Sequence, residues 1–321
     1  MSADRGPEEG PDAGFDVQGH RGALGYLPEN SGAGFALAAR LGATSVELDV
    51  RLSADGVPMV WHDPVLDLRR CRPPHPSLVG RRVDELTSQQ LGEVLIGEHT
   101  REEHPGQRPA PGERMLSLRA LFDQVTRVSP MMRFVVEVKV DQHDPRQRDR
   151  RAELVAATCA VIADCGVFDR STVHSFDWAV LAQAADVAPH LRRSALASVR
   201  VDGCWFGDAL GVAGAGAAPL PVRDLPSAAR DAGAHVVCPY FALPYGGTST
   251  APGFELLANK DLADRCHALG LRIVPWTVDD PADLALVVQA GVDGVVTNYP
   301  DRARRVADAL DRITPAAVGA T

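Results

Sequence analysis

The sequence predicts an α/β fold, a parallel (β/α)8 barrel of the TIM type, and three observations support this. Eight short runs rich in β-branched residues recur along the 321 residues, and a segment with apolar residues at helical spacing follows each run. No G-x-G-x-x-G dinucleotide fingerprint follows the first run, where the sequence reads GHRGALG. A doubly wound open sheet is the alternative, but eight units joined by short crossovers favour closure into a barrel.

The eight predicted strands alternate with helices throughout the chain. They cover residues 16–20, 44–50, 134–140, 171–176, 192–197, 235–240, 272–278 and 294–299. Several of the intervening helices are expected to end at a glycine that adopts the left-handed conformation before the next strand. These glycines are Gly42, Gly166, Gly233, Gly270 and Gly291. We assign them a structural role only.

The barrel domain is predicted to span residues 15–313, between a disordered N-terminal segment (1–14) and a C-terminal tail (314–321). An insertion of about residues 64–116 after the second strand is too long for a simple βα loop and is rich in Pro, Arg and Glu. It is expected to form a subdomain or a lid. The loops 207–221 and 242–255 are expected to lie over the mouth of the barrel, where substrates bind.

Composition excludes several classes of partner. The chain has 33 Lys and Arg against 42 Asp and Glu, a net charge of −9, and no long basic stretch that would suit nucleic acid or an anionic membrane surface. No apolar run approaches the length of a transmembrane segment, so a cytoplasmic protein is expected. The six cysteines are scattered without a C-x-x-C pair, which favours reduced thiols over a zinc site or disulfides. The sequence does not indicate an oligomeric state.

Three carboxylates stand out on two predicted strands. Glu47 and Asp49 share one face of SVELDVRLS (45–53), and Glu137 and Lys139 share one face of VVEVKV. Barrel strands are usually apolar on both faces, so these charges need an explanation. A set of carboxylates without thiolates suits a hard divalent cation, Mg²⁺ or Ca²⁺, with Mn²⁺ as a third option. The structural alternative is an exposed edge strand with solvated charges.

Two histidines are expected near these carboxylates. His20 ends the first strand beside Arg21, and the Asp55-Gly56 turn predicts a hairpin whose returning strand brings His62 back toward the carboxylates. A lone histidine is more often structural than catalytic. Two imidazoles beside a divalent cation and an arginine, however, form a set that could cleave a phosphodiester, because they supply acid–base groups and charge neutralisation together.

Five separated motifs resemble the glycerophosphodiester phosphodiesterase family. They are, in order, HRGALGYLPENS, ELDVRLSADGVPMVWHD, EVK, SFDWAVL and VPWTVDDPADLALVVQAGVDGVVTNYPD. The resemblance covers nearly all of residues 16–311. The resemblance implies a (β/α)8 barrel and metal-dependent hydrolysis of a glycerophosphodiester to glycerol 3-phosphate and an alcohol. A route through a cyclic phosphate is also known in the family, and the sequence does not decide between the two.

The resemblance also implies roles for individual residues. His20 and His62 match the acid–base pair, without indicating which is acid and which is base, and Arg21 matches the phosphate clamp. The metal ligands would be Glu47, Asp49 and Glu137; Lys139 resembles a second cation near the phosphate, and Trp276 an aromatic wall against the glycerol carbons. Ser31 and Asn298 depart from the usual Thr and Asp, which leaves substrate preference open.

Other expectations concern the surroundings of this site. Gly19 and Gly22 are expected to let the backbone approach a phosphate, Asn30 or Ser31 to cap the first helix, and Glu29 to support Arg21. His174, at the end of the fourth strand, is a candidate substrate contact.

Two rival functions remain open at this stage. One is cleavage of a lysophospholipid or another lipid phosphodiester, for which apolar residues at the barrel mouth would be needed. Candidates for this apolar mouth are Trp205, Phe206, Leu210, Val212 and Leu220. The other is a catalytically silent barrel that binds a phosphorylated ligand.

Overall fold

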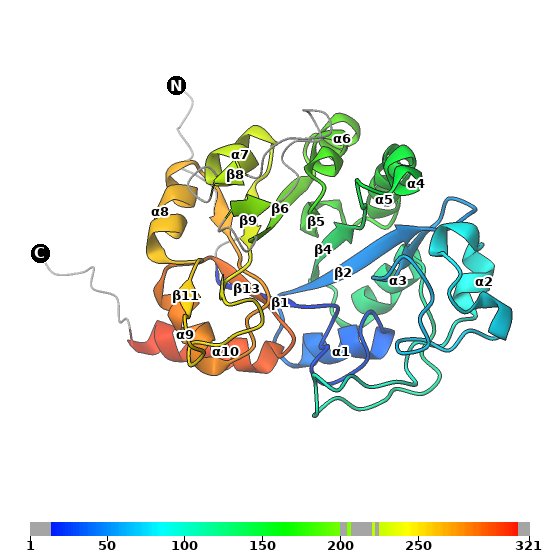
Figure 1. The fold of residues 1–321 in the computed structure, drawn as a ribbon, viewed down its shortest axis with the longest axis horizontal. Helices are drawn as coiled ribbons and strands as arrows, with labels where there is room; N and C mark the ends of the chain where they lie inside the picture. Colours follow the sequence, from blue (N-terminus) through cyan, green and yellow to red (C-terminus); the bar gives the residue numbers. More distant parts are fainter. Residues whose placement is uncertain (1–13, 200–203, 207–219, 222–224, 314–321) are drawn as a thin grey trace, which may run out of the picture.

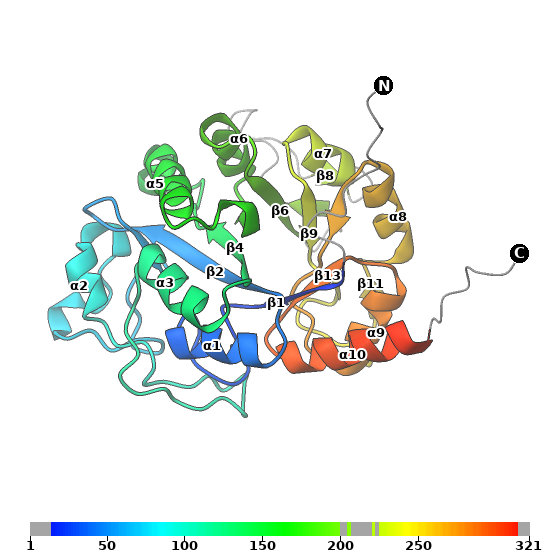
Figure 2. The same cartoon turned by 180° about the vertical axis from the view of Figure 1, so that it is seen from behind.

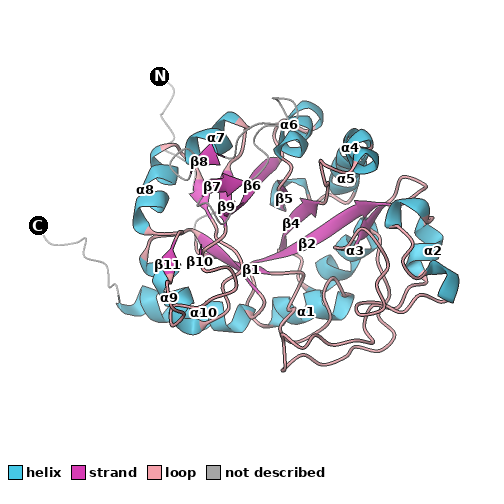
Figure 3. Ribbon diagram, in the orientation of Figure 1, coloured by secondary structure: helices cyan, strands magenta, loops and turns pink. Residues whose placement is uncertain are grey.

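The computed structural model describes residues 14–199, 204–206, 220–221 and 225–313. Eight parallel strands form the centre of the molecule, and helices surround them on the outside (Figure 1; Figure 3). The hydrogen-bonded order of the strands is β12-β9-β6-β5-β4-β2-β1-β13. This arrangement confirms the predicted TIM-type barrel.

The barrel strands and their helices follow the predicted alternation. The strands are β1 (Asp16–Gly19), β2 (Ser45–Leu52), β4 (Arg133–Val138), β5 (Ser171–Ser175), β6 (Arg192–Val199), β9 (Val236–Pro239), β12 (Arg272–Ile273) and β13 (Gly294–Thr297). The outer helices are α1 (Gly32–Arg40), α3 (Leu118–Val128), α4 (Pro145–Asp149), α5 (Arg151–Asp164), α6 (Trp178–Val187), α7 (Leu225–Asp231), α8 (Lys260–Ala268), α9 (Pro281–Gln289) and α10 (Pro300–Ile313). Figure 2 shows the same ring of helices from behind.

The barrel closes where the end of β12 and the residues that follow it meet β13. The amide of Asp293 donates to the carbonyl of Ile273, and the amide of Val296 donates to that of Pro275, both at 2.9 Å. The prediction of a strand over 272–278 is wrong in its extent, because β12 ends at Ile273. Pro275 lies just beyond it and has no N–H to continue a ladder.

The predicted helix-ending glycines adopt the expected conformation. All five have positive φ, between 65° and 88°, a region that costs an L side chain energy and glycine almost nothing. Ser31 caps α1 by accepting a hydrogen bond from the amide of Gly34, as expected. Asp280 caps α9 in the same way, through the amide of Ala282.

The core fills the space between the strands and the outer helices. Its largest apolar cluster includes Phe35, Phe122, Phe134 and Trp178, all at most 2% exposed. Phe122 on α3 packs on Phe134 of β4 with ring centroids 4.6 Å apart. This contact packs α3 against β4, and β4 pairs in register with β2; these two strands carry the predicted carboxylates.

The insertion after β2 has a small apolar cluster of its own. The chain returns antiparallel to β2 through β3 (Pro58–Val60), which confirms the predicted hairpin. The 3-10 helices η1 (Pro76–Leu78) and η2 (Val83–Glu85) and the short helix α2 (Ser88–Gly92) follow. Trp61, Leu66, Leu91 and Met115 pack together there, each at most 2% exposed. The domain limits 15–313 and 64–116 stay predictions.

Smaller elements complete the described residues. They are the 3-10 helix η3 (Phe168–Arg170), the strands β7 (Cys204–Phe206) and β8 (Leu220–Pro221), and the hairpin of β10 (Ala242–Leu243) with β11 (Glu255–Leu256). The described cysteines are free: Cys71, Cys159, Cys165, Cys238 and Cys266. Among the described helices, none has the length and apolar character needed to span a bilayer.

Candidate active site

A cavity of about 580 Å³ opens at the carboxyl ends of the barrel strands. Of the predicted site residues, only Asp49 does not line this cavity, and Asp49 is fully buried. The others all line it: His20, Arg21, Glu47, His62, Glu137, Lys139 and Trp276. The carboxyl ends of the strands are where active sites occur in this fold. The lining also includes residues outside the predicted site: Phe176, Leu196, Ser198, Tyr245, Thr277 and Val296, together with His174.

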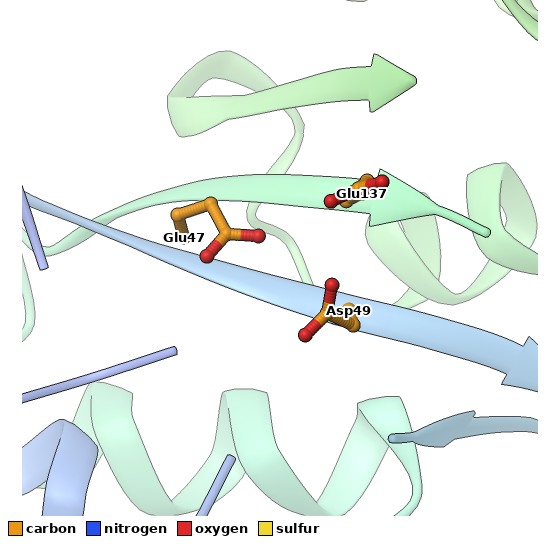
Figure 4. Close-up of side chains that lie close together, drawn as sticks. All are labelled: Glu47, Asp49 and Glu137. Atoms are coloured by element: carbon orange, nitrogen blue, oxygen red, sulfur yellow. The ribbon is translucent and has the colours of Figure 1, made fainter. Parts of the chain in front are cut away.

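The three carboxylates converge from two adjacent strands. Asp49 on β2 is paired in register with Glu137 on β4, and Glu47 lies two residues before Asp49 on the same face (Figure 4). One oxygen from each side chain lies within 4.8 Å of the others, and all three residues are buried. Because Glu47 Oε1 and Asp49 Oδ1 are buried and accept no hydrogen bond, both atoms have lone pairs that could bind a cation.

Two cations contact this cluster from opposite sides. Lys139 Nζ lies 2.7 Å from Glu137 Oε1 and 3.4 Å from Asp49 Oδ1, and Arg21 Nε lies 3.2 Å from Asp49 Oδ2. Burial alone would raise the pKa of Asp49, but Arg21 and Lys139 hold it well below its usual range. Burial and the neighbouring carboxylates raise the pKa of Glu47 well above its usual range. The cluster therefore contains a carboxylate that the resident cations do not fully neutralise.

His20 has a single orientation that the surrounding hydrogen bonds determine. Its Nδ1 lies 2.7 Å from Asn298 Oδ1, and Asn298 Nδ2 donates to Asp279 Oδ2 at 2.6 Å. Since the Asn298 amide nitrogen is engaged with Asp279, its oxygen faces His20 and accepts from Nδ1–H. Nε2, 4.0 Å from Glu47 Oε2, is left as the acceptor. Burial and then Arg21 lower the pKa of His20 to about 3.

His62 has the same arrangement with a carboxylate in place of the amide. Its Nδ1 lies 2.7 Å from Asp63 Oδ1, so Nδ1–H is the donor and Nε2 is free to accept a proton. Arg51 Nε donates to the His62 carbonyl at 2.6 Å and fixes the backbone there. Burial and then Lys139 and Arg21 lower the pKa of His62 to about 4. Both imidazoles are therefore neutral at pH 7 in the protein alone.

Arg21 is held in place by residues of the β1–α1 loop and by β2. Its Nη1 contacts Glu29 Oε2 at 2.5 Å, and its backbone amide donates to Glu47 Oε2 at 3.0 Å. Burial would lower the pKa of the guanidinium, but Asp49 and Glu29 raise it further above its usual range. Arg21 thus remains charged at any relevant pH and faces the cavity from a fixed position.

An aromatic group forms the opposite part of the cavity. Trp276 donates from Nε1 to the carbonyl of Ala197 at 3.1 Å and makes edge-to-face contacts with Phe176 and Tyr240 at 5.4 and 5.1 Å. Tyr245, 68% exposed, stacks on Tyr240 at 4.4 Å and extends the group to the surface. This side of the cavity suits carbon atoms or a cation, since aromatic faces bind both.

Some residues in or beside the cavity were not predicted from the sequence, or were only weakly indicated by it. Asp63 adjoins His62 in the sequence, and its role could have been inferred from that adjacency. Tyr245 lies in the loop 242–255, which was expected at the barrel mouth, but nothing in the sequence distinguished it from its neighbours. His174 lines the cavity, is 1% exposed and has no hydrogen-bond partner at Nδ1.

Two glycines of the β1–α1 loop have a packing role that the sequence did not indicate. A Cβ on Gly19 would lie 2.4 Å from the carbonyl oxygen of Gly22, and one on Gly22 would lie 2.8 Å from the backbone of Gly34. These glycines therefore allow the β1–α1 loop to pack against itself and α1. Their expected approach to a phosphate stays a prediction.

The structure describes only part of the apolar segment that was expected at the mouth of the barrel. Leu210 and Val212 lie outside the described residues. The backbone of Trp205, Phe206 and Leu220 belongs to β7 and β8, but their side chains lie outside the described part of the structure.

Comparison with known proteins agrees with this geometry. The profile of the glycerophosphoryl diester phosphodiesterase family matches residues 20–302. A glycerophosphodiester phosphodiesterase from Caldanaerobacter subterraneus subsp. tengcongensis is 25% identical over 285 residues, which are 89% of this chain and 94% of that protein. The residues matched by the family profile include the whole lining of the cavity described above.

Two solved structures extend the comparison to the fold. A Silicibacter pomeroyi protein assigned as a glycerophosphoryl diester phosphodiesterase superposes with a TM-score of 0.74 at 29% identity, covering 94% of this chain and 95% of that one. An Oleispira antarctica phosphodiesterase in complex with sn-glycerol-3-phosphate superposes with a TM-score of 0.67 at 19% identity, covering 91% and 96%. On the family match, this chain belongs to the glycerophosphoryl diester phosphodiesterase family, whose members are phosphodiester hydrolases.

Proposed function

We propose that this protein hydrolyses glycerophosphodiesters to glycerol 3-phosphate and an alcohol with the help of one divalent cation. The observation that carries the proposal is the pair of neutral imidazoles, His20 and His62, on a cavity that also holds Arg21 and a cluster of buried carboxylates. Hydrolysis of a phosphodiester requires both proton transfer and neutralisation of the phosphate charge, and these groups can supply both. The family match and the glycerol 3-phosphate bound to the Oleispira relative support the substrate class.

The residues that would hold the cation are Glu47, Asp49 and Glu137. The free acceptors at Glu47 Oε1 and Asp49 Oδ1 fit a hard cation such as Mg²⁺, Ca²⁺ or Mn²⁺. When bound, the cation would withdraw charge from a phosphoryl oxygen and lower the barrier by several kcal/mol. We expect it also to bring the three carboxylates into their ionised state, because it removes the repulsion that raises the pKa of Glu47.

The protein's own groups account for the proton transfers. Arg21 and Lys139 would bind the two non-bridging phosphate oxygens, and Trp276 would pack on the glycerol carbons. The negative charge of the bound diester would raise the pKa of the imidazoles from about 3 and about 4, so that one of them carries a proton at neutral pH. The neutral imidazole accepts a proton from the attacking hydroxyl or water at Nε2, and the protonated one donates to the departing alkoxide.

His62 is the imidazole better suited to retain a proton. Its Nδ1–H donates to the carboxylate of Asp63, whereas that of His20 donates to the neutral amide of Asn298. A carboxylate stabilises the imidazolium more than an amide does.

Cleavage of a lysophospholipid is the second candidate. The apolar and aromatic part of the cavity, with Leu196, Val296 and the exposed Tyr245, favours it because an acyl chain would need such a surface. The same catalytic groups would serve either substrate. The two candidates therefore differ in what the aromatic side of the cavity contacts.

The test measures release of glycerol 3-phosphate or choline from glycerophosphocholine, and of choline from lysophosphatidylcholine, in parallel. We expect turnover of glycerophosphocholine with added Mg²⁺, Ca²⁺ or Mn²⁺, and its loss with a chelator. Turnover of lysophosphatidylcholine alone would contradict the proposed substrate. Absence of both activities with every cation would instead support a silent phospho-ligand-binding barrel.

A further inference from the structure

Glu29, on the β1–α1 loop, is shared by three arginines. It is 6% exposed and contacts Arg21 at Oε2, while Arg70 Nη1 at 3.2 Å and Arg101 Nη2 at 2.6 Å contact Oε1. Burial would raise the pKa of Glu29, but Arg21, Arg101 and Arg70 together lower it to about 2. Glu29 is therefore ionised; its Oε2 faces Arg21, whereas its Oε1 is shared by Arg70 and Arg101.

Arg70 and Arg101 both belong to the insertion after β2, which does not itself line the cavity. Arg70 precedes η1, and Arg101 follows α2, so two separate segments of the insertion meet at one carboxylate. The insertion lies beside β2 and α3 in Figure 1, on the side of the barrel that carries the catalytic carboxylates.

Arg70 has a second contact that Arg101 lacks. The same Nη1 atom lies 3.1 Å from Asp63 Oδ1, the oxygen that accepts from His62 Nδ1. The Nη1 atom of Arg70 thus contacts both Glu29, which pairs with Arg21, and Asp63, which accepts from His62. Exposed arginines seldom contribute measurably, but Arg70 is only 28% exposed and its two partners are less exposed still.

We propose that Arg70 and Arg101 are positioning residues through which the insertion supports catalysis. Arg101 acts on Arg21 through Glu29, and Arg70 acts both on Arg21 through Glu29 and on His62 through Asp63. Because Arg70 and Arg101 share the carboxylate of Glu29, Glu29 orients Arg21 without fully neutralising its charge. The guanidinium of Arg21 can therefore still bind a phosphate. A fixed Asp63 keeps His62 in the tautomer that presents Nε2 to the cavity.

The inference rests on the proposed function, and the test uses glycerophosphocholine with a saturating divalent cation. Arg101→Gln should raise KM and weaken glycerol 3-phosphate binding about 3- to 10-fold, with kcat nearly unchanged. Arg70→Gln should produce the same weakening and also lower kcat about 10-fold. The matched control is Arg69→Gln, because Arg69 is 87% exposed and pairs with Asp67, while its only interaction with Asp63 is a long-range attraction through solvent. This variant should stay within about twofold of the unsubstituted protein.

A conservative variant separates positioning from folding. Because a single nitrogen of Arg70 makes both contacts, the ammonium of Arg70→Lys can replace it and should restore most of the kcat lost in Arg70→Gln. A double variant tests whether Arg70 acts on His62 through Asp63. In the Asp63→Asn background, Arg70→Gln should lower kcat less than about threefold.

Three outcomes would overturn the inference. They are Arg70→Gln behaving like Arg69→Gln, Arg101→Gln lowering kcat as much as Arg70→Gln, and Arg70→Gln keeping its full effect on kcat in the Asp63→Asn background. An inactive unsubstituted protein would instead contradict the proposed function, and the binding of glycerol 3-phosphate by calorimetry would then still test Arg70 and Arg101.

Discussion

Buried carboxylates meet cations at both ends of the barrel, but their hydrogen bonding differs. At the amino end, Asp16 Oδ1 accepts from Thr44 Oγ1, Ser45 Oγ and Arg133 Nη2 at 2.6–2.8 Å, and Oδ2 accepts from Gln18 Nε2 at 2.8 Å. Both oxygens of Asp16 are fully engaged. This cluster joins the first residues of β1, β2 and β4 and has a structural role.

At the carboxyl end of the same strands, Glu47 Oε1 and Asp49 Oδ1 make no hydrogen bond and a cavity adjoins them. The difference teaches that burial and charge do not by themselves mark a functional cluster. Unused carboxylate oxygens beside a large cavity do, because a native protein pairs almost all of its buried polar groups. The amino end also has a buried acceptor without a partner, Gln18 Oε1, but it is an uncharged amide oxygen and the cavity beside it is only about 40 Å³. The predictions below test this distinction between the two ends.

The largest effect is expected for Glu47→Gln. Loss of a cation ligand should lower kcat/KM for glycerophosphocholine by roughly 10³-fold or more, since the cation would supply several kcal/mol. The variant should also unfold at the same or a higher temperature than the unsubstituted protein without cation, because one repelling carboxylate is removed. Thermal unfolding measured beside the activity would contradict this if Glu47→Gln were markedly less stable.

A slightly smaller effect is expected for the histidines. His62→Gln or His20→Gln should lower kcat roughly 10²- to 10³-fold, as loss of a general acid or base does. His190, which is exposed and lies outside the described cavity, offers the control variant His190→Gln. Steady-state kinetics with glycerophosphocholine tests this, and a histidine variant with full kcat would remove that histidine from the proposed mechanism.

Asp16→Asn should show the opposite pattern to Glu47→Gln. It leaves Arg133 without its buried carboxylate and should lower the free energy of unfolding by about 2–4 kcal/mol. The value of kcat should change less than twofold, because Asp16 lies at the far end of the barrel from the cavity. Denaturant unfolding and activity of the same preparation provide the measurement, and a large fall in kcat would mean that the two ends are coupled.

Binding of the cation should stabilise the carboxyl end. Titration of the chelator-treated protein with Mg²⁺, Ca²⁺ or Mn²⁺ should raise Tm by a few degrees, since a ligand that binds only the folded state stabilises it. Glu47→Gln should abolish most of this rise, whereas Asp16→Asn should retain it. Equal rises in both variants would place the cation elsewhere.

The smallest effect concerns pH. Burial lowers the pKa of His174 to about 3, so between pH 7 and pH 5 the unfolded chain takes up a proton there and the folded one does not. Stability from this group is therefore lost as pH falls below about 6.5, by roughly 1–2 kcal/mol at pH 5. Glu47 and Glu137, whose pKa values are raised, act in the opposite direction.

The informative quantity is thus the difference between the unsubstituted protein and His174→Gln, measured as the free energy of unfolding at both pH values. His174→Gln should lose less stability between pH 7 and pH 5 than the unsubstituted protein does. Parallel pH profiles for the two proteins would contradict the assignment to His174.

The sequence by itself determined the barrel and the composition of its site. Strand periodicity placed Glu47 and Asp49 on one face, the Asp55-Gly56 turn returned His62 toward them, and the helix-ending glycines marked the repeating units. These features depend on local backbone geometry, which a few consecutive residues specify. For that reason the fold class and the set of chemical groups could be predicted.

Only the tertiary structure decided which partners orient those groups. Asn298 reaches His20 across 278 residues of sequence, and Arg70 and Arg101 reach Glu29 from an insertion whose conformation no periodicity specifies. The packing role of Gly19 and Gly22 and the early end of β12 were likewise visible only in three dimensions. Such contacts depend on closure of the whole barrel, since residues far apart in sequence meet only once every strand and loop between them is packed.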